Sequence, residues 1–124
     1  MIYKATFTGC TNGAIGIRHR ITTWTKGDTE DDARTAIYDR WEHISKLVLE
    51  PFSGTLYDAC IALGIPTSNH YSDLYIPDTP DTRWLVKVFD VPAESFTSNI
   101  DGSRMFDVPF AFLPFWDSVV DKRA

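Results

Sequence analysis

The sequence predicts an α+β protein in which antiparallel β-hairpins carry two to four helices on one face, in the order β-β-α-β and then α-β-α-β-β-α. Three observations predict this class. Apolar and polar residues alternate around a glycine turn near each end of the chain, and segments between the turns repeat apolar residues at helical spacing. A hydrophobic content of 44% over 124 residues is enough to bury a core.

Length and composition predict one domain over residues 1–124, which two α+β modules, 1–51 and 52–124, could make up. Cys10 and Cys60 lie far apart in sequence, and we expect two free thiols in a reducing compartment. No basic leader follows Met1, and no stretch approaches the about 18 apolar residues of a membrane span. We therefore expect a cytoplasmic protein without a membrane partner.

The net charge limits the classes of partner that we expect. Twelve Lys and Arg against 17 Asp and Glu give a net charge of −5, so the chain as a whole repels phosphate backbones. We therefore expect no direct binding of nucleic acid.

The N-terminal segment predicts a β-hairpin, because apolar and polar residues alternate before and after Asn12-Gly13. A two-residue loop would place Phe7 opposite Arg18. A three-residue loop, Thr11-Asn12-Gly13 with Gly13 left-handed, places Phe7 opposite Ile17 and keeps the apolar face whole. We therefore prefer the second register.

Residues 29–43 predict the main helix. Asp28 or Thr29 offers an N-cap, and acidic residues 30–32 fill the first turn, where the helix dipole favours negative charge. Apolar residues recur at helical spacing, at Ala33, Ile37, Trp41 and Ile44. The apolar run 46–50 then predicts a short buried strand, which Pro51 stops.

Two further helices are predicted by their end signals. A short one begins at a Thr55 cap and ends at Gly64, and another opens at Thr79-Pro80. Between them, residues 74–76 predict a brief strand.

The C-terminal third predicts a closing hairpin around Asp101-Gly102. With Gly102 left-handed, Phe96 lies opposite Phe106, on the face that also carries Val108, Phe110 and Phe112. Pro109 cannot donate to a ladder, so we expect its strand at an edge or interrupted there. Pro114 is expected to open a final short helix.

The three histidines have no recognisable catalytic setting. His19 falls in the alternation of the first hairpin. His43, at the end of the main helix, complements the helix dipole and is placed to pair with Asp39. Glu42-His43 alone falls short of a metalloprotease helix, which needs two His on one face. We therefore expect no metal site and no cofactor.

His70 lies in a polar segment, 69–73, that is expected to be a loop. Such a cluster can form a site, and a small enzyme that uses His70 with Asp73 is one alternative function. The other interpretation is that these side chains satisfy nearby backbone groups. Asp73, Asp78 and Asp81 could collect a cation, but their spacing matches no calcium loop.

A basic stripe is the candidate binding surface. Lys4, Arg18 and Arg20 lie beside Trp24 on the hairpin face opposite Phe7. Such a stripe could grip carboxylates of a partner protein or the phosphates of a small nucleotide. The alternative is a solvated face that pairs with its own acidic neighbours.

Residues 69–77 and 100–116 resemble segments of small proteins encoded by bacteriophages and prophages. The resemblance implies an accessory protein, acting in a bacterial host, that binds and blocks a defence component as anti-CRISPR-type proteins do. It carries over no catalytic residue.

The leading hypothesis is therefore a non-enzymatic binding protein that docks on a host protein or complex. Phe115 and Trp116 join Trp24 and the two arginines as its expected anchors. A second hypothesis is a sponge that sequesters a small nucleotide signal between subunits of a homo-oligomer, with the arginines on phosphates.

Overall fold

The computed structural model describes residues 1–11, 17–70 and 73–109, with residues 69 and 70 described by their backbone alone. The chain divides into two compact units, Met1–Ser53 and Gly54–Ala124, close to the module boundary that the sequence suggested. Both combine helices with antiparallel sheets, so the predicted α+β class is confirmed. None of the helices in the described ranges has the length and apolar run needed to cross a bilayer.

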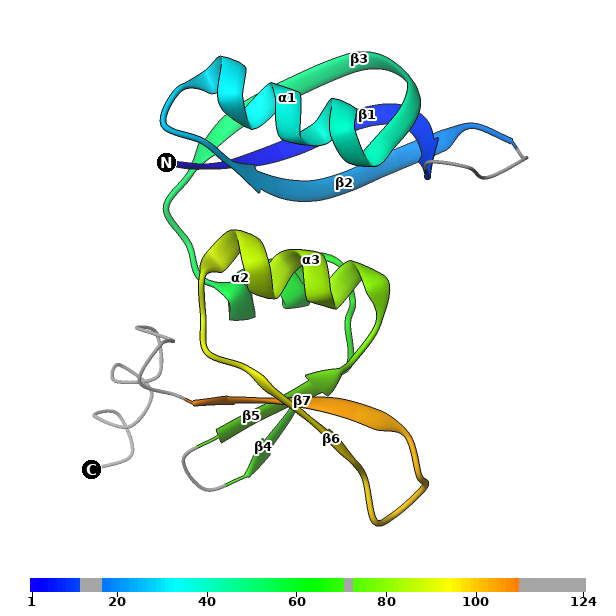
Figure 1. The fold of residues 1–124 in the computed structure, drawn as a ribbon, viewed down its shortest axis with the longest axis vertical. Coiled ribbons are helices and arrows are strands. Elements are labelled where there is room, and N and C mark those ends of the chain that lie inside the picture. The colour runs from blue at the N-terminus through cyan, green and yellow to red at the C-terminus, as the bar shows by residue number, and fades with distance from the viewer. Residues whose placement is uncertain (12–16, 71–72, 110–124) are drawn as a thin grey trace. The chain divides into compact units, whose positions relative to one another are not determined.

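In the first unit, one helix covers one face of a three-stranded antiparallel sheet of order β2-β1-β3 (Figure 1). Its elements are β1 (Ile2–Thr11), β2 (His19–Lys26), α1 (Glu30–Arg40) and β3 (Trp41–Phe52). Thr25 of β2 identifies the covered face, because its hydroxyl donates a buried hydrogen bond of 2.8 Å to the Ala33 carbonyl. Tyr3, opposite Thr25, shares this face with the buried Ala5 and Phe7. Gly27 permits the close packing, since an added Cβ would lie 2.5 Å from the Ala33 nitrogen.

The predicted register of the first hairpin is wrong. Phe7 lies opposite Ile21, and pairing ends where Gly9 meets His19. Ile17 lies before β2 and is 90% exposed. Ile17 and Ile21 are four residues apart, so pairing with either of them keeps Phe7 on an apolar face. Strand alternation therefore cannot distinguish two registers that differ by an even number of residues. The predicted turn at Asn12-Gly13 lies outside the described residues.

The main helix ends earlier than predicted, at Arg40, and the next strand is longer, at 41–52. The predicted place of His43 at the helix end is therefore wrong. The register between β1 and β3 shifts twice, between Thr6 and Thr8 and between Thr8 and Cys10. His43 and Lys46 have positive φ, 54° and 57°, at these shifts. Each marks a β-bulge, which adds one residue to β3.

Replacing Lys46 by glycine is expected to raise the free energy of unfolding by about 0.5–1 kcal/mol. The left-handed conformation costs a side-chain-bearing residue about 1–2 kcal/mol, part of which the greater freedom of glycine in the unfolded chain offsets. Urea unfolding checks this against Lys87→Gly in the last turn of helix Pro80–Phe89, which should lower stability by about 0.5–1 kcal/mol. Destabilisation by Lys46→Gly would contradict the bulge.

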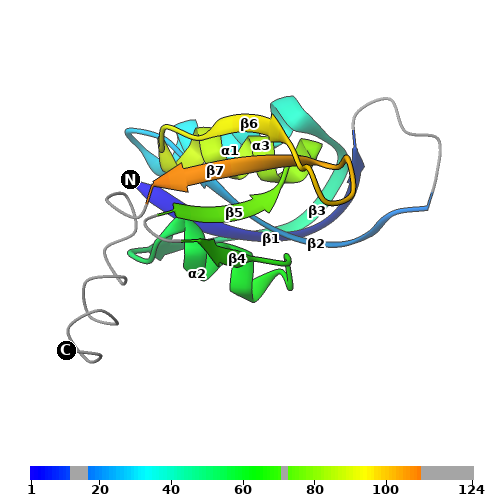
Figure 2. The same ribbon diagram turned by 90° about the horizontal axis from the view of Figure 1, so that it is seen from below.

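In the second unit, the four strands form an antiparallel sheet of order β4-β5-β7-β6 (Figure 2). The elements are α2 (Leu56–Ala62), β4 (Ser68–His70), β5 (Asp73–Pro77), α3 (Pro80–Phe89), β6 (Glu94–Thr97) and β7 (Arg104–Pro109). Helices α2 and α3 lie on the same side of this sheet (Figure 1). The buried face of the two inner strands carries Leu74, Ile76, Phe106 and Val108. The predicted strand at 74–76 is confirmed as part of β5, whereas β4 was not predicted.

The helix signals of the second unit are confirmed. Thr55 and Asp58 form a reciprocal capping box at α2, and Gly64 is left-handed just after it, at φ 67°. At α3, Thr79 caps the helix and Pro80 occupies its first turn. The end of α3 differs from the usual pattern, because Asp90 rather than glycine takes the left-handed position.

The closing hairpin has the left-handed Gly102, at φ 74°, but not the predicted pairing. Phe96 lies opposite Met105, and Ser95 lies opposite Phe106. This one-residue difference moves Phe96 to the other face, where its ring meets Tyr75 edge-to-face at 5.1 Å.

Of the two alternatives expected for Pro109, the edge position is wrong, because β7 lies between β5 and β6, and the interruption is confirmed, because β7 ends at Pro109. Pro109 is tolerated as the last residue of β7, since β6 pairing stops where Glu94 meets Asp107. Phe110, Phe112 and the helix expected at Pro114 lie outside the described residues.

Candidate functional site

The exposed end of the first hairpin carries two of the predicted binding residues, Arg18 and Arg20. We name Ile17, Arg18, His19 and Arg20 the cation patch; all four are exposed. Arg18 donates a hydrogen bond to the Ser45 hydroxyl of β3. Because β1 separates β2 from β3, this guanidinium reaches across the central strand.

The two arginines of the cation patch are not paired with carboxylates in the part of the chain that the structure describes. The ion pairs there include Arg34 with Glu30 and Arg83 with Asp78, and neither Arg18 nor Arg20 takes part in one. The alternative of a face neutralised by its own acidic neighbours therefore does not apply to these arginines within the described residues.

Trp24 does not offer the exposed ring that the sequence analysis expected. Its side chain is 1% exposed, and its ring meets that of Phe52 edge-to-face at 5.5 Å. Lys4, its register partner, places Nζ 5.9 Å from the centre of the same ring. Strand alternation puts both residues on the face away from α1, as expected, but it cannot show that this part of the face is buried. Trp24 is therefore a packing residue in this structure.

His70 and Asp73 are register partners in the hairpin of β4 and β5, so the chain brings their backbones opposite each other. The side chain of His70 lies outside the described residues, and the proposed role of this pair stays a prediction. Phe115 and Trp116 lie outside the described residues as well.

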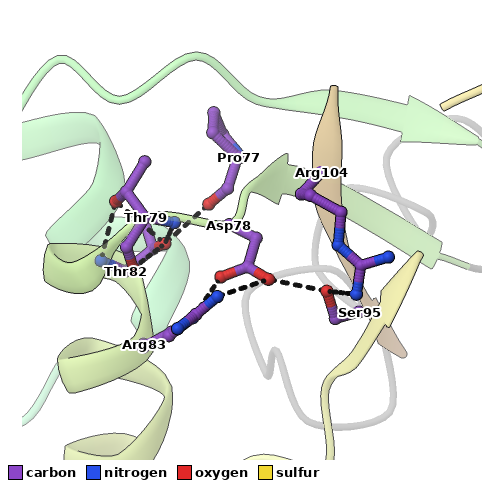
Figure 3. A network of polar contacts seen from close by, with 7 residues as sticks. All are labelled: Pro77, Asp78, Thr79, Thr82, Arg83, Ser95 and Arg104. Atoms are coloured by element: carbon purple, nitrogen blue, oxygen red, sulfur yellow. Dashed lines mark hydrogen bonds and ion pairs between the residues drawn. The ribbon is translucent and has the colours of Figure 1, made fainter. Parts of the chain in front are cut away.

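Asp78, one of three carboxylates considered for a cation in the sequence analysis, belongs to a network of polar contacts (Figure 3). Its carboxylate accepts hydrogen bonds of 2.6 Å from Arg83 Nε and from the Ser95 hydroxyl. Arg104 Nη2 in turn donates to the Ser95 hydroxyl at 2.9 Å. The hydrogen bonds from Arg83, then that from Ser95, lower the pKa of Asp78, although partial desolvation opposes them. The network joins the start of α3 to β6 and β7.

A second cluster was missed because its members are distant in sequence. Cys10 of β1 lies opposite Glu42 of β3, and His43 follows at the bulge. One ligand atom from each of the three side chains lies within 4.8 Å of the others. We name these residues the Cys10 cluster. The sequence signal was the Glu42-His43 dipeptide, but only the strand register supplies the cysteine.

The other cysteine has a different environment. Cys60 is fully buried in α2, and desolvation raises the pKa of its thiol to about 11. Such a thiol stays protonated at neutral pH, which fits the packing role expected from its place on the apolar stripe.

Three groups stand out among the described residues: the cation patch, the Asp78 network and the Cys10 cluster. Searches of protein-family models, curated proteins and solved structures found no match to this chain.

Proposed function

We propose that this chain is a non-enzymatic binding protein that docks on an acidic surface of another protein through the cation patch. One observation carries the proposal: Arg18 and Arg20 are exposed and have no carboxylate partner among the described residues, in a chain whose net charge is −5. In an acidic protein, two neighbouring arginines without a carboxylate partner among the described residues form a surface complementary to carboxylates of another protein.

The residue types suit recognition. A guanidinium presents a planar fork of donors that matches a carboxylate with two parallel hydrogen bonds. Exposed ion pairs alone contribute little, so the affinity must come from arginines that become desolvated at the centre of an interface. Ile17, at 90% exposure, supplies apolar area next to Arg18 for that purpose.

The setting that we propose is a phage-type accessory protein that inhibits a bacterial defence system by docking on a host protein in the cytoplasm. The segments that resemble phage and prophage proteins support this part. The cation patch supports the mode of binding and is independent of that resemblance.

The test is a comparison of two charge-reversed double variants in capture from a bacterial host lysate. Arg18→Glu with Arg20→Glu should lose the protein that the wild type captures. The control is Arg34→Glu in α1 with Lys87→Glu in α3, which changes the net charge by the same amount as the first double variant. It should retain the captured protein. Equal capture by both variants would count against the cation patch, as would loss by both.

The nucleotide hypothesis gives a different result in the same system. Arginines on phosphates would retain a small nucleotide through purification, and only the first double variant would lose it. Trp24, at 1% exposure, does not offer an accessible ring for stacking on a base. We therefore favour the protein partner, and nucleotide released from the purified wild type would overturn that choice.

A further inference from the structure

We propose that the Cys10 cluster is a binding site for a divalent cation of the zinc type. The site would lie at the end of the first sheet where β1 and β3 meet. The proposal does not depend on the docking function.

The backbone brings the three residues together. Cys10 is opposite Glu42 in the register, and its thiol donates to the Glu42 carbonyl with an Sγ–O distance of 3.7 Å. Gly9 allows this approach of the strands, because a Cβ there would lie 2.9 Å from the same carbonyl oxygen. The two strands therefore approach each other closely at this point.

The bulge at His43 helps to supply the third ligand. Its φ of 54° is uncommon for a residue with a side chain and carries a cost, so glycine would be the usual occupant. Glu42 and His43 are adjacent and both exposed, yet their ligand atoms gather with the buried Cys10 sulfur. An ordinary strand would send two successive side chains to opposite faces.

The distances suit a small tetrahedral ion after modest adjustment. Zinc bonds of about 2.0–2.3 Å place neighbouring ligand atoms about 3.5 Å apart. The three ligand atoms here lie within 4.8 Å of one another. The carboxylate of Glu42 and the imidazole of His43 make no hydrogen bond or ion pair with another described residue, so both are free to turn inward.

The ligand types select the class of ion. Thiolate and imidazole favour zinc and its borderline-soft neighbours, whereas calcium and magnesium prefer oxygen alone. Three protein ligands leave a fourth position for water or for a further side chain.

Cobalt(II) is the best probe, because it takes zinc sites and reports its ligands by absorption. Untagged protein, freed of metal by a chelator, should bind one Co²⁺ per chain with a thiolate-to-metal charge-transfer band and the visible bands of a tetrahedral ion. Zinc should then displace the cobalt, and the charge-transfer band and the visible bands should disappear. Absence of saturable binding, or an octahedral spectrum without the charge-transfer band, would overturn the proposal.

Variants assign the ligands. Cys10→Ser should abolish the charge-transfer band, and His43→Asn, which suits the left-handed backbone, should weaken binding by at least about 10-fold. Glu42→Gln should weaken it similarly. Cys60→Ser is the matched control and should bind as the wild type does. Retention of the band by Cys10→Ser, or wild-type affinity in His43→Asn that is folded by circular dichroism, would exclude this site.

Discussion

Phe7→Ala is expected to lower the free energy of unfolding by about 3–5 kcal/mol, the range for removing a buried ring from a core. Phe7 is 0% exposed, and its ring meets Trp41 edge-to-face at 5.5 Å. The substitution removes this contact and leaves a cavity on the face that α1 covers. Urea unfolding followed by circular dichroism measures the loss.

Ile17→Ala is the matched control for that measurement. Ile17 is 90% exposed and lies outside β2, so its truncation should change stability by less than about 0.5 kcal/mol. Ile21→Ala, opposite Phe7, should destabilise more than Ile17→Ala. The reverse order would favour the three-residue loop and contradict the observed register.

Asp78→Asn has the second largest expected effect on stability, a loss of about 1–2 kcal/mol in the free energy of unfolding at neutral pH. The change removes the charge from a carboxylate that is 2% exposed and accepts hydrogen bonds from Arg83 and Ser95. Hydrogen bonds to charged groups contribute about 1.5–3 kcal/mol, and the 65% exposure of Arg83 reduces this through solvent screening.

The sign of the pH dependence follows from the lowered pKa of Asp78. A carboxyl whose pKa is lower in the folded than in the unfolded state stabilises the fold above the unfolded value, about 3.9. That stabilisation is lost as pH falls through the folded pKa. The stability difference between wild type and Asp78→Asn should therefore be full at neutral pH and shrink in acid.

Unfolding at several pH values checks this, with Asp28→Asn as control. Asp28 is exposed and makes no hydrogen bond or ion pair with another described residue, so its substitution should leave stability nearly unchanged at every pH. A difference for Asp78→Asn that stays constant down to strongly acidic pH would contradict the network.

The starts of the two helices of the second unit were predictable, because capping is a local signal. Each helix start is marked by residues close together in sequence, Thr55 with Asp58 for α2 and Thr79 with Pro80 for α3. Pairing depends on residues that are far apart, and both hairpin registers were wrong. In the first hairpin the error was an even slip that kept the apolar face. In the second it was a single residue, which moved Phe96 to the other face.

The long β3 strand was mistaken in part for helix for a physical reason. Trp41 packs on Phe7, and Leu49 lies opposite Ala5, so both belong to the covered face. Between them each bulge adds one residue, and the apolar positions 41, 44 and 47 recur every third residue. This spacing imitates a helical repeat and continues the true repeat of α1.

The candidate sites also include features that the sequence predicts and features that depend on residues far apart in the chain. Arg18 and Arg20 were identified because charge is visible in the sequence, and the absence of a carboxylate partner among the described residues required coordinates. The burial of Trp24 could not be foreseen from alternation, which gives the face of a strand but not what covers it. The Cys10 cluster joins residues 32 positions apart through a doubly bulged register, which no sequence pattern here specified.

The central claim is that the cation patch makes the binding contact, and the affinity of the purified partner tests it most directly. Calorimetry should show that Arg18→Glu with Arg20→Glu weakens binding by at least about 30-fold, the effect of one interface hot spot. Arg34→Glu with Lys87→Glu, which leaves the cation patch unchanged, should bind within about threefold of the wild type, since charges outside the centre of an interface contribute little to affinity. Equal affinity for the wild type and the first double variant would contradict the claim.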